Sequence, residues 1–131
     1  MSMSPIAAQE SLAYYFTGLA SSPRPTSWNV SLHTGAPGNS GTANEVTDSA
    51  YARQSAVFAL NIVDSAFPLV ANSANIAYAN AATSYTATHV VVWDNTNGQP
   101  LVIQRLVTDK VVAAGSPAQF ATGELIIGGR N

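Results

Sequence analysis

Apolar and polar side chains alternate along much of this chain, with the period of a half-buried strand. The alternation is clear over residues 28–32 and again over residues 51–60. Residues 89–93 include three consecutive valines and form the strongest strand candidate. The Asn97-Gly98 pair that follows is a strong hairpin signal, because both residue types tolerate a positive φ. We therefore predict that residues 101–107 pair antiparallel with residues 89–93.

Shorter strand candidates lie on both sides of this hairpin. They are at residues 75–79, 111–112, 119–120 and 124–127, and a turn is expected at Gly115. Residues 61–69 are predicted to be irregular, with one short strand at most. About seven or eight short strands separated by turns are typical of a β-sandwich or a jelly-roll-like barrel. The predicted fold class is therefore mostly β, with a single β-sandwich domain over residues 1–131.

A helical pattern precedes the first strand. Ser4 is a good N-cap, and Pro5 is favoured at the first helical position. Apolar residues then recur at helical spacing, at Ala8, Leu12, Tyr15, Phe16 and Leu19. Gly18 and the Ser-Ser-Pro sequence at 21–23 predict the end of the helix. We expect a short N-terminal α-helix at about residues 5–19, whose apolar stripe covers one end of the core rather than binding a partner.

Composition changes the picture from a generic β-domain to a component of an assembly. Hydrophobic residues make up 47% of the chain and charged residues 9%, with a formal net charge of −2 and Lys110 as its single lysine. A globular domain usually has about 25% charged residues. Because interface cores are depleted of charge, the deficit predicts a surface largely covered by partners and a homo-oligomer, with a trimer favoured. A neutral secreted protein is the alternative interpretation.

The same sequence argues against several classes of protein. Disordered chains are charged and poor in aliphatic residues, unlike this one. A membrane span needs about 18 or more apolar residues in a row, and the apolar runs here are strand-sized. Five lysine and arginine residues, scattered along the chain, cannot form a phosphate-binding patch, so no nucleic acid is expected. Residues 1–19 lack the basic and apolar regions of a secretory signal peptide.

No set of residues rises to a catalytic, cofactor or metal site. The chain has no cysteine and two histidines, His33 and His89, which are too few for a zinc site. We expect each histidine to be structural and hydrogen-bonded to the backbone. Residues 94–98 lack the glycine and glutamate spacing of an EF-hand, and residues 35–38 lack the lysine of a phosphate loop. The sequence therefore predicts a protein that is not an enzyme and holds no cofactor or metal.

The longest predicted loop, from Thr34 to Ser49, is the candidate binding region. It is rich in Gly, Asn, Ser and Thr, and loops of this length are usually functional or bound to a partner. Arg53 is expected to anchor the loop through Glu45 or Asp48, since arginine makes bidentate contacts with carboxylates. An ion pair within the chain is favoured over one between subunits. The candidate partner-binding residues are Thr34, Pro37, Asn39, Asn44, Glu45 and Arg53, together with the N-terminal segment.

Three short sequences around this loop carry a resemblance to a known family. They are Val-Ser-Leu-His-Thr-Gly-Ala-Pro-Gly at 30–38, Asn-Glu-Val at 44–46 and Ala-Tyr-Ala-Arg at 50–53. In this order they resemble a set of small tailed-bacteriophage virion proteins, commonly labelled tail-fibre proteins. The segments 87–94 and 112–115 continue the similarity. The resemblance implies a virion structural protein in which a helix precedes the first strand.

One departure from the family pattern lies inside the loop. The family often has an aspartate where this chain has Gly35 and Ala36. If that acid forms a salt link or binds a cation in relatives, this chain lacks the group.

Three functions remain open. The first expectation is a capsid decoration, or cement, subunit that binds and stabilises neighbouring capsid proteins. The alternative is a tail-fibre or receptor-binding module, and the third is an enzyme such as a glycan hydrolase. No repeat or coiled-coil stalk is evident for a fibre, no aromatic cluster for a receptor-binding loop, and no carboxylate pair for a glycosidase. The expected partners are the major capsid protein or tail proteins, in a virion assembled in the host cytoplasm.

Overall fold

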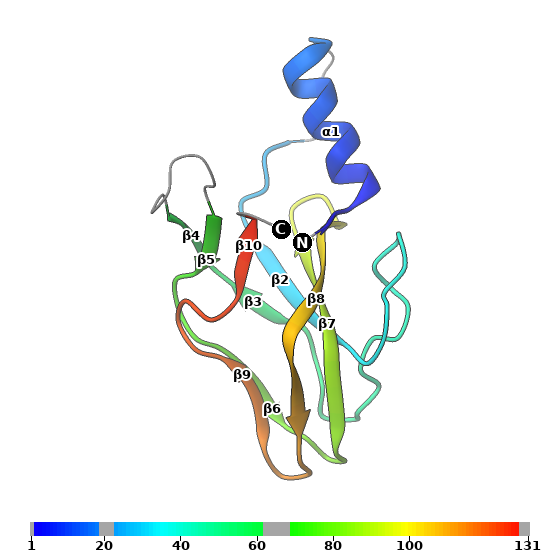
Figure 1. The fold of residues 1–131 in the computed structure, drawn as a ribbon, viewed down its shortest axis with the longest axis vertical. Coiled ribbons are helices and arrows are strands. Elements are labelled where there is room, and N and C mark those ends of the chain that lie inside the picture. The colour runs from blue at the N-terminus through cyan, green and yellow to red at the C-terminus, as the bar shows by residue number, and fades with distance from the viewer. Residues whose placement is uncertain (1, 19–22, 62–68, 129–131) are drawn as a thin grey trace.

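A five-stranded antiparallel sheet forms the larger layer of the protein. The structure is a computed structural model in which residues 2–18, 23–61 and 69–128 are described (Figure 1). The strand order in this sheet is β1-β8-β7-β2-β3. Its strands are β1 (Ser2–Met3), β2 (Trp28–His33), β3 (Gln54–Ala56), β7 (Tyr85–Asp94) and β8 (Gln99–Val112). The antiparallel order agrees with the predicted pairing around the hairpin.

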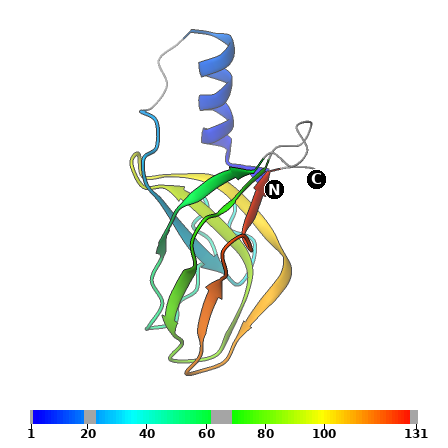
Figure 2. The ribbon, with the colours of Figure 1, turned by 90° about the vertical axis from the view of Figure 1, so that its left-hand side faces the viewer.

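Two smaller sheets form the second layer. A three-stranded sheet has the order β10-β5-β4, and a two-stranded sheet pairs β6 with β9. Figures 1 and 2 show both on the same side of the large sheet. Their strands are β4 (Phe58–Asn61), β5 (Leu69–Asn72), β6 (Ile76–Asn80), β9 (Pro117–Phe120) and β10 (Ile126–Gly128). The predicted mostly-β sandwich with a short N-terminal helix is therefore confirmed.

The core lies between these layers and follows the pleat of β2 and β7. Successive side chains of a strand point to opposite faces, and one face of these two strands enters the core cluster through Val30, Leu32, Val90 and Val92. From the second layer they meet buried side chains such as Ile76, Phe120 and Leu125. Each fully buried side chain of this size contributes about 1.5–3 kcal/mol of transfer free energy. The core is thus built from strand alternation that is visible in the sequence.

The β7–β8 hairpin is longer than predicted. Its two strands cover residues 85–94 and 99–112 instead of 89–93 and 101–107. Gly98 has a φ of 70° and closes the turn by donating its N–H to the Asp94 carbonyl oxygen at 2.8 Å. The buried Asp94 carboxylate accepts the N–H groups of Thr96 and Asn97 at 2.9 and 3.0 Å. The predicted turn is confirmed, and the Asp94 side chain accepts hydrogen bonds from its backbone.

The predicted strand at 51–60 is divided between the two layers. Gln54–Ala56 pairs with β2 as β3, whereas Phe58–Asn61 pairs with β5 as β4. Val57 lies between them, and its carbonyl oxygen accepts the N–H of Ser73 at 2.9 Å. A uniform strand pattern was expected here because alternation does not record which sheet a strand joins. Strand β5 was not predicted, and residues 62–68 lie outside the described residues.

Helix α1 (Pro5–Phe16) begins where the sequence predicts it to begin. The Ser4 hydroxyl accepts the N–H of Ala7 at 3.2 Å and donates to the carbonyl oxygen of Pro100. The Ser4 N–H also donates to the Leu101 carbonyl oxygen at 2.8 Å. The helix start is therefore bonded to the first residues of β8. The helix ends at Phe16, before the predicted end, and Leu19 lies outside the described residues.

The prediction that α1 covers the core is wrong. Ala7 is the only buried residue that the helix contributes. Leu12, Tyr15 and Phe16 of the predicted apolar stripe are 59%, 75% and 80% exposed. Figures 1 and 2 show the reason: the helix leaves the end of the sandwich and extends away from it. Its first turn contacts β8, and the sandwich closes its own core without the rest.

We predict that Asn72 is essential to the second layer. Its buried side chain donates to the Ala74 and Ala121 carbonyl oxygens and accepts the Leu125 N–H, each at 2.9 Å. Asn72→Ala removes the partner of three backbone groups, so unfolding free energy should fall by about 2–3 kcal/mol. Urea unfolding followed by tryptophan fluorescence measures it.

The matched control for this prediction is Asn39→Ala. Asn39 is exposed in the loop after β2, so its replacement should change stability by less than about 0.5 kcal/mol. Equal losses in the two variants would contradict the role given to Asn72.

Candidate assembly surfaces

The Thr34–Ser49 loop covers the outer face of the large sheet. Ser31, His33, Val91 and Trp93 point away from the core cluster, yet all four are buried. Gly41 lets the loop backbone lie close to the sheet. A Cβ placed on it would lie only 3.2 Å from both Val91 Cγ1 and Pro100 Cβ. Figure 1 shows this loop on the side of the sheet opposite the second layer. Strands β2 and β7 are consequently buried on both faces.

A chain of buried polar groups ties the loop to the sheet. The Trp93 indole N–H donates to the Ser31 hydroxyl at 2.8 Å, and that hydroxyl lies 2.8 Å from His33 Nε2. His33 Nδ1 lies 2.8 Å from the carbonyl oxygen of Ala43 in the loop. A carbonyl oxygen only accepts, so Nδ1 carries the proton and Nε2 accepts from Ser31. The expected structural role of His33, with a backbone hydrogen bond, is confirmed.

Burial lowers the pKa of His33, and the neighbouring charges partly cancel. The Ala43 carbonyl and the Glu45 carboxylate raise this pKa, whereas Arg53 and His89 lower it. The neutral ring suits the hydrogen bonds just described, because a protonated ring offers no acceptor to the Ser31 hydroxyl. The loop is therefore held to the sheet by an uncharged histidine.

Glu45 and Arg53 form a second attachment of the loop. Arg53 Nε and Nη2 donate to the two oxygens of Glu45, each at 2.9 Å. The Tyr51 hydroxyl donates to the same carboxylate at 2.7 Å, and the guanidinium lies 4.1 Å from the centre of the Trp93 ring. Burial opposes ionisation of Glu45, but the bonds from Arg53 and Tyr51 outweigh it and lower the Glu45 pKa. The predicted ion pair within the chain is confirmed.

Asp48 attaches the end of the loop to a different part of the sandwich. Its carboxylate accepts the backbone N–H groups of Ala82 and Thr83 at 3.0 and 2.7 Å. These bonds lower the pKa of the Asp48 carboxyl group. Of the two carboxylates predicted to anchor Arg53, Glu45 does so and Asp48 instead joins the loop to the turn before β7.

The six candidate partner-binding residues occupy three different environments. Thr34, Asn39 and Asn44 are exposed, with Asn44 at a φ of 59°. Pro37 is fully buried beneath the loop. Glu45 and Arg53 bind each other, as described above. Contacts within the chain thus account for the order of the loop, and binding of a partner by these residues stays a prediction.

A second surface, on helix α1, was not recognised as such in the sequence. Five large apolar side chains, Ile6, Leu12, Tyr14, Tyr15 and Phe16, are exposed on it, and we call them the α1 apolar surface. Glu10 is the one charged residue between Pro5 and Phe16. The signal was present as the apolar stripe at 8–19. It was assigned to the core because periodicity identifies an apolar face but not what covers it.

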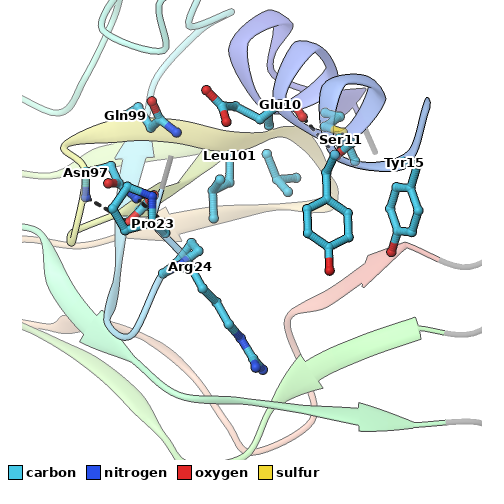
Figure 3. Close-up of a pocket in the computed structure, with 14 residues that line it drawn as sticks. Glu10, Ser11, Tyr15, Pro23, Arg24, Asn97, Gln99 and Leu101 are labelled. Atoms are coloured by element: carbon cyan, nitrogen blue, oxygen red, sulfur yellow. Dashed lines mark hydrogen bonds between the residues drawn. The ribbon is translucent and has the colours of Figure 1, made fainter. Parts of the chain in front are cut away.

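A groove separates α1 from the β7–β8 hairpin. Its volume is about 670 Å³, and apolar side chains such as Met3 and Leu101 share it with Arg24. Figure 3 labels residues from three segments around it: Glu10, Ser11 and Tyr15 of α1, Pro23 and Arg24 of the segment before β2, and Asn97, Gln99 and Leu101 of the hairpin. The groove therefore adds a mixed apolar and polar surface beside the exposed helix.

Two further ion pairs join charged side chains elsewhere in the described residues. Arg105 pairs with Asp109 at 2.8 Å, and Lys110 pairs with Glu124. Within residues 2–18, 23–61 and 69–128, no three histidine, aspartate or glutamate side chains are grouped as metal ligands. In the same part of the chain, no helix is long and apolar enough to cross a membrane.

We predict that stability depends on pH through His33. The unfolded side chain takes up a proton near pH 6.5, whereas the folded one does so only at lower pH. The unfolded state then binds more protons, so the free energy of unfolding is highest above pH 6.5 and falls as pH decreases. Urea midpoints between pH 8 and pH 5 measure this fall.

His33→Gln is the test variant and His89→Gln its control. His33→Gln should lower stability at pH 8 but flatten the pH dependence. Burial and Arg105 also lower the pKa of His89, but it lies outside the buried network, so His89→Gln should keep most of the slope. An unchanged slope in His33→Gln would refute this assignment.

Comparison with known proteins gives the identity of the family. A family model described as "Podophage GP4 fiber I protein gp80" matches residues 2–128. No curated protein sequence matches the chain. The matched range covers both the sandwich and α1, and it agrees with the resemblance to phage virion proteins found around the loop. The chain therefore belongs to the podophage GP4 fiber I protein gp80 family and is a structural protein of a phage virion.

Proposed function

We propose that this chain is a non-enzymatic subunit of a fibre on a podophage particle. The observation that carries the proposal is the family match over residues 2–128, since the family description names a fibre protein. The structure adds a helix that extends from one end of the sandwich and exposes apolar side chains. Such a helix can attach the sandwich to neighbouring virion proteins.

The proposal reverses the order of the two functions expected from the sequence. Capsid decoration was preferred partly because no stalk was evident. Helix α1 projects along the long axis of the molecule (Figures 1 and 2) and supplies a stalk-like element. Capsid decoration becomes the alternative function. The location of the protein in the particle distinguishes a fibre subunit from a decoration subunit.

The rest of the surface suits a subunit surrounded by other virion proteins. With 9% charged residues, the chain can approach neutral neighbours without desolvating many charges. The loop after β2 is held in one conformation by His33 and Glu45, so its exposed side chains need little further ordering on binding. We propose that this loop and α1 contact tail proteins and further copies of this chain.

Locating the protein in intact particles tests the proposed function. A short epitope inserted into the exposed turn between β8 and β9 lies at the opposite end of the sandwich from α1 (Figure 1). Gold-labelled antibody should then mark the tail region in electron micrographs. Label spread over the capsid would overturn the fibre proposal and support capsid decoration. Fully assembled particles that carry no label would contradict both the fibre and the decoration proposals.

We predict that the exposed tip of the Thr34–Ser49 loop contacts another virion protein. Asn39→Arg adds a long charged side chain at an exposed position, so it should leave unfolding unchanged but reduce incorporation into particles several-fold. The control is Ala114→Arg in the exposed β8–β9 turn. Immunoblots of purified particles measure incorporation of both variants.

Equal incorporation of Asn39→Arg and Ala114→Arg would contradict the prediction that the loop contacts another virion protein. Substitution is preferable to shortening the loop, because Pro37, Gly41 and Ala43 support the sheet beneath. A shortened loop would confuse loss of a contact with loss of the fold.

A further inference from the structure

We propose that Asn97 is a modification site, whose side-chain amide is lost by deamidation when the hairpin turn opens, and that the folded turn holds this reaction back. The site lies where the turn meets the segment before β2, so its modification would loosen that junction. The inference goes beyond the proposed function and does not rest on it, because it concerns the chemistry of the chain itself. Its tests use the isolated full chain.

The sequence makes Asn97 the intrinsically most reactive asparagine of the chain. Deamidation begins when the backbone nitrogen of the following residue attacks the side-chain carbonyl carbon. A glycine nitrogen is the most accessible nucleophile for this step, because glycine has no Cβ to hinder its approach. Gly98 follows Asn97, and no other asparagine of the chain is followed by glycine.

The reaction consumes only water. The Gly98 nitrogen gives up its proton and bonds to Asn97 Cγ, and the bond between Cγ and Nδ2 breaks. The departing NH2 group takes up that proton and leaves as ammonia, so a succinimide ring remains. Water then adds to either carbonyl carbon of the ring and opens it, which gives aspartate or isoaspartate at position 97.

In the folded turn the attacking nitrogen is already engaged. The Gly98 N–H donates to the Asp94 carbonyl oxygen at 2.8 Å. To attack, this nitrogen must lose that proton and turn toward Cγ of Asn97, so its hydrogen bond must break first. Gly98 is exposed, and water therefore reaches the site. Hydrogen bonding, and not exclusion of water, is what slows the reaction.

The side chain under attack is also held in place. Asn97 Nδ2 donates to Asp94 Oδ2 at 2.5 Å and to the Pro23 carbonyl oxygen at 2.8 Å. The Asn97 backbone N–H donates to the other oxygen of the Asp94 carboxylate at 3.0 Å. Closure of the ring must rotate the side chain away from these acceptors. The turn therefore has to open before Asn97 reacts.

Asn97 belongs to a junction between the turn and the segment before β2. In this junction the Thr26 N–H donates to the Thr96 hydroxyl at 2.9 Å, and the Asn95 N–H donates to the Ser27 carbonyl oxygen at 3.0 Å. The bond from Asn97 to Pro23 extends the junction toward α1, and both residues line the groove beside that helix. Figure 3 shows them next to each other at one end of the groove.

The product of the reaction would weaken this junction. A carboxylate at position 97 has no N–H to donate to the Pro23 carbonyl oxygen. It would also place an oxygen where Nδ2 now lies 2.5 Å from the buried Asp94 carboxylate, and two carboxylates so close repel each other. Deamidation would therefore release the segment before β2 from the turn.

The first test compares the folded chain with the chain unfolded in guanidinium chloride, both at neutral pH. Peptide mass spectrometry measures the conversion of each asparagine over time. In the unfolded chain Asn97 should react several-fold faster than Asn39 and Asn72, which are each followed by serine. Folding should slow Asn97 about tenfold or more, because each 1.4 kcal/mol, roughly, that opening of the turn requires lowers the open population tenfold.

Equal rates for Asn97 in the folded and unfolded chains would overturn the protection. An unfolded chain in which Asn97 reacts no faster than Asn39 would overturn the site. Asp94→Ala removes acceptors of the turn and should speed the reaction of the folded chain several-fold. Asp109→Ala, which removes a carboxylate from the surface of β8, should not. If Asp94→Ala fails to fold, the comparison of folded with unfolded wild type decides.

The second test examines the product directly in the variant Asn97→Asp. Hydrogen exchange followed by mass spectrometry should be several-fold faster than in wild type over residues 23–27 and 94–98. Asn97→Ala loses the same donor without adding a charge, so its exchange should rise less. Asn39→Asp makes the same chemical change in an exposed part of the loop and should leave both segments unchanged. Wild-type exchange in Asn97→Asp would overturn the proposed loosening of the junction.

Discussion

Strands β2 and β7 are buried on both faces, and most of the protein serves to cover one face or the other. The second layer covers the side with Val30, Leu32, Val90 and Val92. The Thr34–Ser49 loop covers the side with Ser31 and Trp93. Because residues 30–33 of β2 and 90–94 of β7 are buried, this part of the sheet can act as the rigid centre to which the loop, the hairpin and α1 attach.

Where the loop covers the outer face of the sheet, the buried polar side chains must form hydrogen bonds within the protein because water is excluded. An unpaired buried donor or acceptor costs about 1–3 kcal/mol, so Trp93, Ser31 and His33 form a continuous chain of hydrogen bonds that ends on Ala43. The ion pair of Glu45 and Arg53 then closes the edge of the loop over Trp93. Few charges are needed elsewhere, which agrees with a chain that is 9% charged.

Helix α1 follows a different principle from the sandwich. Its start is determined locally by Ser4 and Pro5 and by bonds to β8. Its direction carries it away from the core (Figure 1), and its apolar side chains are exposed. A rigid body with a projecting apolar helix is a simple way to build a larger structure from small subunits. The family match to a podophage fibre protein is consistent with such a use.

Features that depend on neighbouring residues could be read from the sequence. The helix start, strand 28–32, the turn before Gly98 and the pairing of Glu45 with Arg53 each rest on a local signal of spacing or residue type. The candidate loop was located correctly, because its composition differs from that of the strands around it. Each of these features depends on residues that are close in the sequence, so the sequence alone is enough to predict it.

Tertiary structure alone decided the features that depend on distant parts of the chain. Alternation could not show that residues 51–60 divide between two sheets, because both halves present the same pattern. Composition could not show that Pro37 and Gly41 lie on the sheet, since the burial of Ser31 and His33 arises only when the loop folds back. The stripe at 8–19 predicted an apolar helix face, but whether it meets the core depends on where β8 fixes Ser4. Periodicity identifies the apolar face of the helix, but only the packing of the described residues shows that the core of the sandwich does not cover it.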